Sequence, residues 1–128
     1  MSFFPYLTVI DCENSIDFYT NAFGFKLTDS AIDESSKIQH AEMEFLNNKI
    51  MFCCEGAYGT TAKAPKTYNI EASLNLYMYC ENVDDLFLQA KANNAKILKE
   101  PEVAFWGDRW CEIEDINGYK WSFAKRIA

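Results

Sequence analysis

The spacing of apolar residues in the first half of the chain changes from that of a strand to that of a helix and back. Ile16, Tyr19 and Phe23 recur at intervals of three and four residues, which predicts an amphipathic helix with Asn14 or Ser15 as its N-terminal cap. Short runs rich in β-branched and aromatic residues, or with alternating apolar and polar residues, precede and follow it, as expected of strands. The strands predicted in this half are residues 6–10, 25–30, 38–46 and 49–54.

The same order of elements returns in the second half. A helix is predicted over residues 83–92, and the strands around it are residues 74–80, 95–98, 109–114 and 119–124. Sliding the chain along itself by 70 positions places residues 40–45 on residues 110–115, and both segments share the form x-small-Glu-apolar-Glu. Gly24 and Asn93-Asn94 would end the two helices, and Asn117-Gly118 predicts a tight hairpin turn. The sequence therefore predicts a repeated module of one strand, one helix and three strands.

Two such modules, about residues 1–58 and 71–128, are joined by a predicted linker, residues 59–70, that is rich in turn-forming residues. A module of about 60 residues buries too little surface to be stable alone, so the two are expected to share a core within one domain. We predict an α+β fold in which two βαβββ modules pair into a curved mixed sheet around a cleft, with the helices on the outer face.

Strand alternation assigns the side chains to the two faces of each predicted sheet. Apolar positions such as Met43 and Phe52 belong under the helices, so the opposite face is expected to line the cleft. Trp106 and Arg109, from the loop before the next-to-last strand, are further candidates, although an Arg beside Asp108 also fits a local ion pair. The candidate ligand-binding residues are His40, Glu42, Glu44, Met51, Tyr77, Tyr79, Trp106, Arg109, Trp110, Glu112, Glu114 and Ser122.

The candidate face combines aromatic rings with carboxylates. The rings of Tyr77, Tyr79 and Trp110 would stack on a flat group, and a Glu-x-Glu segment from each module supplies negative charge. Cation–π contacts, worth about 0.5–2 kcal/mol each, would then favour a cationic or aromatic small molecule. The alternative is a solvated sheet face, on which carboxylates and tyrosines need no ligand.

Composition and charge exclude several classes of protein. Apolar residues make up 49% and aromatic residues 16% of the 128 residues, which excludes a disordered chain. The net charge of −7 argues against binding to nucleic acid, because phosphate backbones are bound by clustered cations.

No apolar run is long enough to span a bilayer and no secretory signal pattern is present, so we expect a cytoplasmic protein with no membrane partner. The five cysteines have no C-x-x-C spacing, which favours reduced and mostly buried thiols.

Several segments of the chain resemble glyoxalase and bleomycin-resistance proteins. The opening is similar in Tyr6-Leu7-Thr8-Val9-Ile10-Asp11, Ser15-Ile16-Asp17-Phe18-Tyr19 and Phe23-Gly24-Phe25. Later segments are similar in Cys80-Glu81-Asn82-Val83-Asp84-Asp85-Leu86, Trp106-Gly107-Asp108-Arg109 and Asp115-Ile116-Asn117-Gly118-Tyr119-Lys120-Trp121-Ser122-Phe123. The resemblance implies the vicinal oxygen chelate superfamily, which is built from paired βαβββ modules. It also implies a homodimer. The function it implies is either that of a metal-dependent lyase, isomerase or dioxygenase, or metal-free binding of an antibiotic.

The resemblance further places the metal ligands of the enzymes in that superfamily on the first and last strands of each module. In this sequence those positions are Phe4, Asn75 (or Leu74 in a shifted register), Met51 and Ser122, and none is a good ligand for a divalent metal. We therefore predict a protein that uses no metal or other cofactor and binds or sequesters an antibiotic-like small molecule. No catalytic residue is assigned.

Two alternatives remain open at this point. The first is a metal-dependent lyase, isomerase or dioxygenase of the same superfamily, with a non-standard metal site around His40 and Glu42. The second is a structural or regulatory dimer whose cleft binds nothing.

Overall fold

The computed structural model describes residues 1–127, and it contains two four-stranded mixed sheets. The first module comprises β1 (Tyr6–Val9), α1 (Cys12–Phe23), β2 (Lys26–Ile32), β3 (Ile38–Phe45) and β4 (Asn48–Cys54). The second comprises β5 (Asn75–Tyr79), α3 (Val83–Ala92), β6 (Lys96–Val103), β7 (Asp108–Glu114) and β8 (Lys120–Arg126). Between them the chain forms a 3₁₀ turn, η1 (Ala57–Gly59), and the short helix α2 (Pro65–Tyr68).

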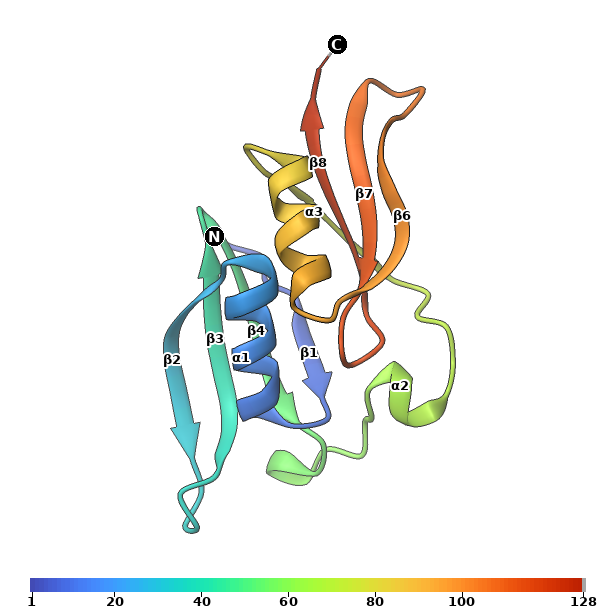
Figure 1. Ribbon diagram of the computed structural model, residues 1–128. Coiled ribbons are helices and arrows are strands. Elements are labelled where there is room, and N and C mark those ends of the chain that lie inside the picture. Colours follow the sequence, from blue (N-terminus) through green and yellow to red (C-terminus); the bar gives the residue numbers. More distant parts are fainter. Residues whose placement is uncertain (128) are drawn as a thin grey trace.

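The two sheets have the same topology. Their strand orders are β1-β4-β3-β2 and β5-β8-β7-β6, and in each sheet the first strand lies parallel to the last strand of its module. Helices α1 and α3 lie side by side, each against its own sheet (Figure 1). The predicted α+β fold of two βαβββ modules is therefore confirmed.

Several element boundaries differ from the prediction by a few residues, most notably at the start of α1 and at the end of β6. Asp11, rather than Asn14 or Ser15, caps α1, because Oδ1 of Asp11 accepts a hydrogen bond of 2.9 Å from the backbone N–H of Asn14. Gly24 ends this helix in the left-handed conformation (φ 81°), as predicted. β6 is longer than predicted and includes Pro101, which an edge strand tolerates because the missing N–H can face away from the sheet.

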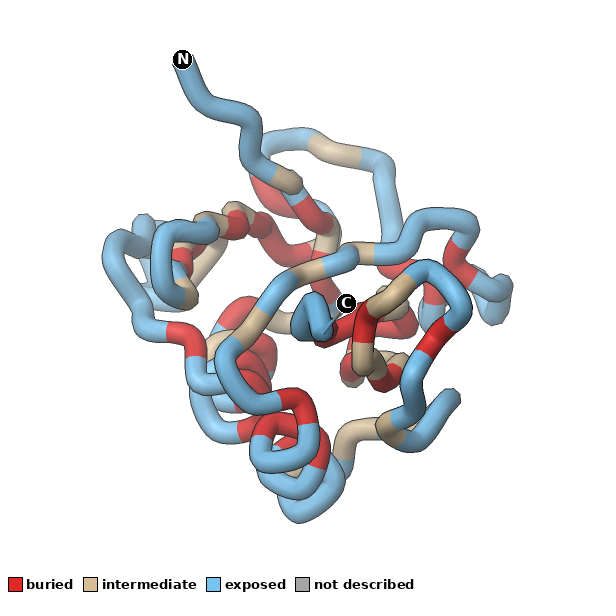
Figure 2. The backbone as a smooth tube through the Cα atoms, turned by 90° about the horizontal axis from the view of Figure 1, so that it is seen from above, coloured by how far each residue is buried: buried red, intermediate tan, exposed pale blue. Residues whose placement is uncertain are grey.

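Both modules contribute to one buried core. The ring of Tyr19 on α1 lies 5.6 Å from Trp121 of β8, 5.7 Å from Phe52 of β4 and 5.9 Å from Phe23, centroid to centroid. All four side chains are buried. Figure 2 shows the buried segments within the body of the molecule, whereas the N-terminal segment is exposed and leads away from it. No helix within residues 1–127 is long and apolar enough to cross a membrane.

A buried carboxylate, that of Asp115, connects this aromatic core to the second module. Its Oδ2 accepts hydrogen bonds from the Tyr19 hydroxyl at 2.6 Å and from the Trp121 indole N–H at 2.9 Å. Its Oδ1 accepts the backbone N–H groups of Asn117 at 2.8 Å and Tyr119 at 3.0 Å. Burial raises the pKa of Asp115, and these four donors act in the opposite direction because they favour the ionised form. The four donors thus fix the hairpin between β7 and β8.

The same hairpin closes the exposed edge of β1. The side-chain oxygen of Asn117 accepts the N–H of Ile10 at 2.9 Å, and the Tyr119 hydroxyl donates to the carbonyl oxygen of Thr8 at 2.8 Å. The carbonyl oxygen of Asn117 also accepts the N–H of Lys66 at 3.0 Å, which holds the linker against the hairpin. One turn therefore contacts the first module, the second module and the linker.

Replacing Tyr19 by Phe should destabilise the protein, because it leaves the buried carboxylate of Asp115 with three donors instead of four. We expect the free energy of unfolding, measured by urea denaturation, to fall by about 1.5–3 kcal/mol. Tyr68→Phe is the matched control, since that ring is 53% exposed, and should change the value by less than about 0.5 kcal/mol. Equal effects of the two exchanges would contradict the role given to Asp115.

Gly118→Ala should be more costly than Gly56→Ala, although both glycines have a positive φ (90° and 83°). A Cβ on Gly118 would lie 2.8 Å from the backbone nitrogen of Lys66, whereas a Cβ on Gly56 would have no neighbour within 4 Å. The left-handed backbone costs an alanine about 1–2 kcal/mol in either case, so the difference reports the clash with the linker. Urea denaturation measures both variants, and faster proteolysis of the linker is expected only for Gly118→Ala.

Candidate functional site

The inner face of the second sheet, opposite the helices, carries three rows of side chains. The rows follow the strand register across β5, β8 and β7: Asn75, Lys120 and Glu114; then Tyr77, Ser122 and Glu112; then Tyr79, Ala124 and Trp110. Strand alternation therefore holds as predicted for these candidates. The middle strand β8 contributes the small residues Ser122 and Ala124, and larger side chains stand on both sides of them.

The aromatic side chains at one end of this face are joined through Asp108. Its Oδ2 accepts hydrogen bonds from the hydroxyls of Tyr77 at 2.6 Å and Tyr79 at 2.8 Å, and its Oδ1 lies 3.0 Å from Nε of Arg126. The indole N–H of Trp106 donates to the Tyr77 hydroxyl at 3.0 Å. We call Tyr77, Tyr79, Trp106 and Trp110 the aromatic wall; the ring centroids of Trp106 and Trp110 are 5.3 Å apart.

Asp108 has no exposed surface, and its charge is stabilised by this network. The hydrogen bond from Tyr77, followed by that from Tyr79 and the charge of Arg126, holds the pKa of Asp108 below its usual value. Burial and the bond to Asp108 raise the pKa of Tyr77, so its hydroxyl stays protonated and keeps donating at neutral pH. The sequence placed Asp108 with Arg109 as a candidate ligand-facing pair in a loop, whereas the structure has Asp108 as the first residue of β7.

Arg109 lies on the opposite face of β7. Its Nε and one terminal nitrogen each donate a hydrogen bond of 2.8 Å to the carboxylate of Asp84 on α3. The pair therefore joins the sheet to its helix, and Arg109 does not face the aromatic wall. The local ion pair that the sequence left open is formed, but with Asp84 rather than Asp108.

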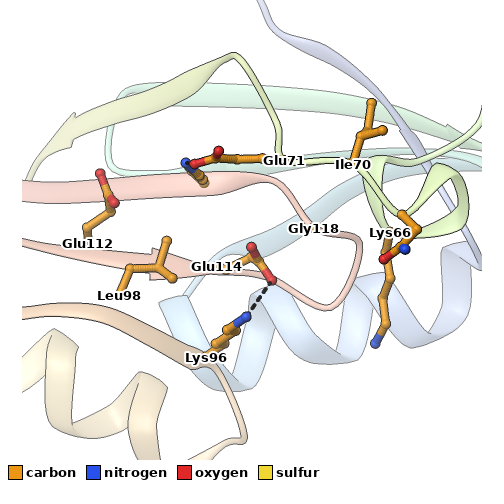
Figure 3. A pocket seen from close by; sticks show the side chains of 10 residues that line it. Lys66, Ile70, Glu71, Lys96, Leu98, Glu112, Glu114 and Gly118 are labelled. Atoms are coloured by element: carbon orange, nitrogen blue, oxygen red, sulfur yellow. Dashed lines mark hydrogen bonds and ion pairs between the residues drawn. The ribbon is translucent and has the colours of Figure 1, made fainter.

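A cavity of about 500 Å³ lies at the other end of the inner face, against the linker (Figure 3). Its charged lining consists of Lys66, Lys96, Lys120, Glu71, Glu112 and Glu114. Lys96 lies 3.9 Å from Glu114, Lys120 pairs with Glu71, and Asn75 donates to Glu112 at 3.0 Å. The carboxylates of the second sheet are therefore largely compensated by groups of this chain.

The candidates of the first sheet form a separate group, closed by its own hydrogen bonds. The Tyr6 hydroxyl lies 2.8 Å from Nδ1 of His40, and Nε2 of His40 lies 3.1 Å from Oε2 of Glu42. Lys49 donates to the other oxygen of Glu42 at 3.0 Å. The bonds from Lys49 and His40 hold the pKa of Glu42 below its usual value. Glu44 lies further along the same strand, opposite Lys49 in the register.

The two groups do not meet in one chain. Among residues 1–127, no hydrogen bond or ion pair joins His40, Glu42, Glu44 or Met51 to the aromatic wall or to Glu112, Glu114 and Ser122. The cavity against the second sheet is lined by that sheet and the linker, and none of the first-sheet candidates reaches it. The aromatic wall and this cavity lie at opposite ends of the inner face of the second sheet, and they are the two candidate sites of the single chain.

The described residues do not fit the metal centre that the superfamily implies. Met51 and Ser122 occupy matching positions on β4 and β8, and neither side chain is a good ligand for a divalent metal. At the alternative site, both ring nitrogens of His40 are engaged and an ammonium group already neutralises Glu42. Within residues 1–127, no three His, Cys, Asp or Glu side chains are placed to hold a metal ion together.

Two of the cysteines, Cys12 and Cys111, are unsuited to act as nucleophiles. All five are free thiols, and Cys12 and Cys111 are buried in the core. Burial raises the pKa of each of these two thiols to about 12, so both stay protonated at neutral pH.

The fold and the site define a paired-module protein of the vicinal oxygen chelate superfamily, with a ligand-sized cavity against one sheet. The family described as the Glyoxalase/Bleomycin resistance protein/Dioxygenase superfamily matches residues 4–123, and the chain belongs to it. An uncharacterised protein of Mycobacterium bovis is 26% identical over 129 residues, which cover 96% of this chain and 82% of that protein.

Solved structures with the same fold include proteins of different activities. TioX from Micromonospora sp. ML1 has a TM-score of 0.79 at 21% identity, with 99% of both chains covered. A mutant of glyoxalase I from Zea mays has a TM-score of 0.76 at 21% identity, covering 98% of this chain and 45% of that one. The fosfomycin resistance protein FosX from Listeria monocytogenes, complexed with Mn(II), has a TM-score of 0.70 at 15% identity, covering 96% and 86%. At these identities the likeness establishes the fold and not the ligand.

Replacing Asp108 by Asn should change how stability depends on pH. Because the folded-state pKa of Asp108 is lowered, its contribution is fully present above the ordinary value of about 3.9 and is lost as the pH falls through the folded-state value. The difference in unfolding free energy between wild type and Asp108→Asn should therefore be largest at neutral pH and shrink below about pH 4.

Urea denaturation across that pH range measures this difference. Asp17→Asn serves as the control, because Asp17 is exposed on α1. A difference for Asp108→Asn that stays constant from neutral to acidic pH would contradict the network described above.

Proposed function

We propose that this protein binds a small planar aromatic molecule on the inner face of its second sheet and holds it stoichiometrically, without a metal cofactor. The observation that carries the proposal is the aromatic wall, whose tyrosines are tied to the buried carboxylate of Asp108. Tyr77, Tyr79 and Trp106 nevertheless remain 42%, 48% and 38% exposed, so their rings are available for stacking. The antibiotic-like class of ligand predicted from the sequence belongs to this proposal.

Ring stacking, rather than net negative charge, is the basis of recognition in this proposal. Glu42 and Glu114 have lysine partners and Glu112 has Asn75, so a cationic ligand would have to displace groups that already neutralise or satisfy these carboxylates. Fixed rings lose little conformational entropy when a flat ligand binds them. A cationic aromatic compound is therefore expected to bind through its rings, with little gain from its charge.

Replacing Tyr77 by Leu should weaken the binding of planar aromatic compounds about tenfold, because a ring of the wall is lost. Isothermal calorimetry with a panel of bicyclic and tricyclic compounds, both neutral and cationic, measures this loss. Tyr6→Leu is the matched control, because Tyr6 occupies the equivalent place in the first sheet, opposite Met51 as Tyr77 is opposite Ser122. The proposal fails if no compound binds more tightly than millimolar, or if only Tyr6→Leu weakens binding.

The enzymatic alternative and the homodimer are each tested by a measurement of their own. A metal-dependent activity would require a stoichiometric transition metal in protein purified without chelator, and the described side chains offer no set of ligands for it. The homodimer and the cytoplasmic location stay predictions from the sequence, and sedimentation analysis tests the first.

A further inference from the structure

The cavity against the second sheet has two facing walls (Figure 3). Inner-face residues of β6, β7, β8 and the β7–β8 turn form one wall, and residues 66–71 of the linker form the other. The linker wall is anchored, because the backbone N–H of Lys66 donates to the carbonyl oxygen of Asn117 at 3.0 Å. At about 500 Å³ the cavity has the size of a small-molecule site. It is therefore a second place, apart from the aromatic wall, where a ligand can reach the protein.

Six charged side chains line this cavity, and four of them are paired with one another. Lys96 lies 3.9 Å from Glu114 within the sheet wall. Lys120 of the sheet pairs with Glu71 of the linker and so connects the two walls. One glutamate of the sheet and one lysine of the linker are left over.

The glutamate is Glu112 on β7, whose charge has no ion-pair partner of its own. Asn75 donates to Oε2 of Glu112 at 3.0 Å, but an amide carries no charge. Lys99, which lies opposite Glu112 in the register, pairs with Glu102 at 3.3 Å instead. Within residues 1–127, Oε1 of Glu112 accepts no hydrogen bond, and it is not one of the buried atoms that lack a partner. This oxygen is therefore open to solvent and to a donor from a ligand.

The ammonium group of Lys120 does not neutralise Glu112 by itself. It donates to Glu71, and the charges of Glu71, Glu112 and Glu114 all act on it. The hydrogen bond from Lys120 to Glu71, followed by these three charges, raises the pKa of Lys120. With Lys96, two ammonium groups face three carboxylates, so this part of the cavity favours one further cation.

The lysine that is left over is Lys66 on the linker. Its side chain is exposed, and among residues 1–127 it forms no ion pair. Figure 3 shows Lys66 and Glu112 towards opposite ends of the cavity, with Glu114 and Lys96 between them. The two unmatched charges are therefore of opposite sign and lie apart.

The cavity also offers apolar contact. Ile70 and Leu98 line it and remain 60% and 36% exposed. A methylene chain that lies against these side chains would lose contact with water, which favours binding. A ligand that satisfies both ends must carry an ammonium group for Glu112 and a carboxylate for Lys66, with a chain between the two.

We propose that this cavity binds an elongated zwitterion, in which an apolar chain separates an ammonium group held by Glu112 from a carboxylate held by Lys66. An amine alone would leave Lys66 without a partner, and an acid alone would leave Glu112 without one. An α-amino acid carries both charges at one end and reaches only one of the two residues. The site does not use the aromatic wall, so this ligand is additional to the planar compound of the proposed function.

A series of compounds tests each feature of this ligand in an NMR titration. ω-Amino acids with chains of four, six and eight carbons are compared with the amine and the carboxylic acid of the same length. Because ion pairs at partly exposed sites are weak, we expect the best ω-amino acid to bind about fivefold more tightly than its amine or its acid. Norleucine, an isomer of the six-carbon compound with both charges at one end, should also bind about fivefold more weakly than the best compound. The amide signals of residues 66–71 and 112–120 should shift on binding.

Lys66→Gln and Glu112→Gln each remove one charge but keep the shape of the cavity. In Lys66→Gln the best ω-amino acid should bind only as tightly as its amine, and in Glu112→Gln only as tightly as its acid. Lys63→Gln and Glu34→Gln are the matched controls, because both side chains are exposed and neither lines the cavity. These two should change the affinity by less than about twofold. Amide spectra that match wild type show that each variant is folded.

The remaining outcomes would overturn the proposal. Equal binding of the ω-amino acids and their amines, or of the ω-amino acids and their acids, would mean that only one end of the ligand is recognised. Norleucine binding as tightly as the best ω-amino acid would mean that the separation of the charges is not recognised. If no ω-amino acid binds, the zwitterion site is wrong, whereas the proposed function is unaffected because the binding of planar aromatic compounds is measured separately.

Discussion

The arrangement of the two modules depends on one buried carboxylate. Asp115 accepts two side-chain and two backbone donors, and one of these donors, Tyr19, comes from the helix of the other module. A buried charge is tolerated only when its hydrogen bonds are satisfied, so this geometry leaves the β7–β8 hairpin little freedom. The turn that follows, with Asn117, then supports β1 and the linker. The strands that carry the aromatic wall are therefore fixed from the core outward.

The distribution of charge follows from the same separation of faces. The inner faces pair their glutamates with lysines, as in Glu42 with Lys49 and Glu114 with Lys96. Other carboxylates lie on outer segments, such as Glu34 in the exposed turn between β2 and β3 and Asp85 in the first turn of α3. The net charge of −7 keeps molecules apart in solution, while the inner-face glutamates that have lysine partners add little to the charge of that face. Net charge alone is a poor guide to the ligand.

Much of the fold, but less of the site, could be predicted from the sequence. Period-two alternation decides which face a strand residue takes, so the placement of Glu112 and Tyr77 on the inner face followed directly. Asp108 and Arg109 were predicted as a ligand-facing pair in a loop, but both lie in β7, where neighbouring residues point in opposite directions, so only Asp108 faces inward. The lysine partners could not be predicted, since a long flexible side chain reaches neighbours that sequence spacing does not define.

The two modules share a topology but use it differently. In equivalent rows, Met51 lies under a tyrosine whose hydroxyl is bound to His40, whereas Ser122 lies beside a tyrosine whose hydroxyl is drawn towards Asp108. The second arrangement directs the hydrogen bond of the tyrosine to Asp108 at the end of the sheet, and the short side chain of Ser122 is fully buried. Duplication of a module therefore supplies the scaffold twice, and a few inner-face residues decide how each copy arranges its own hydrogen bonds.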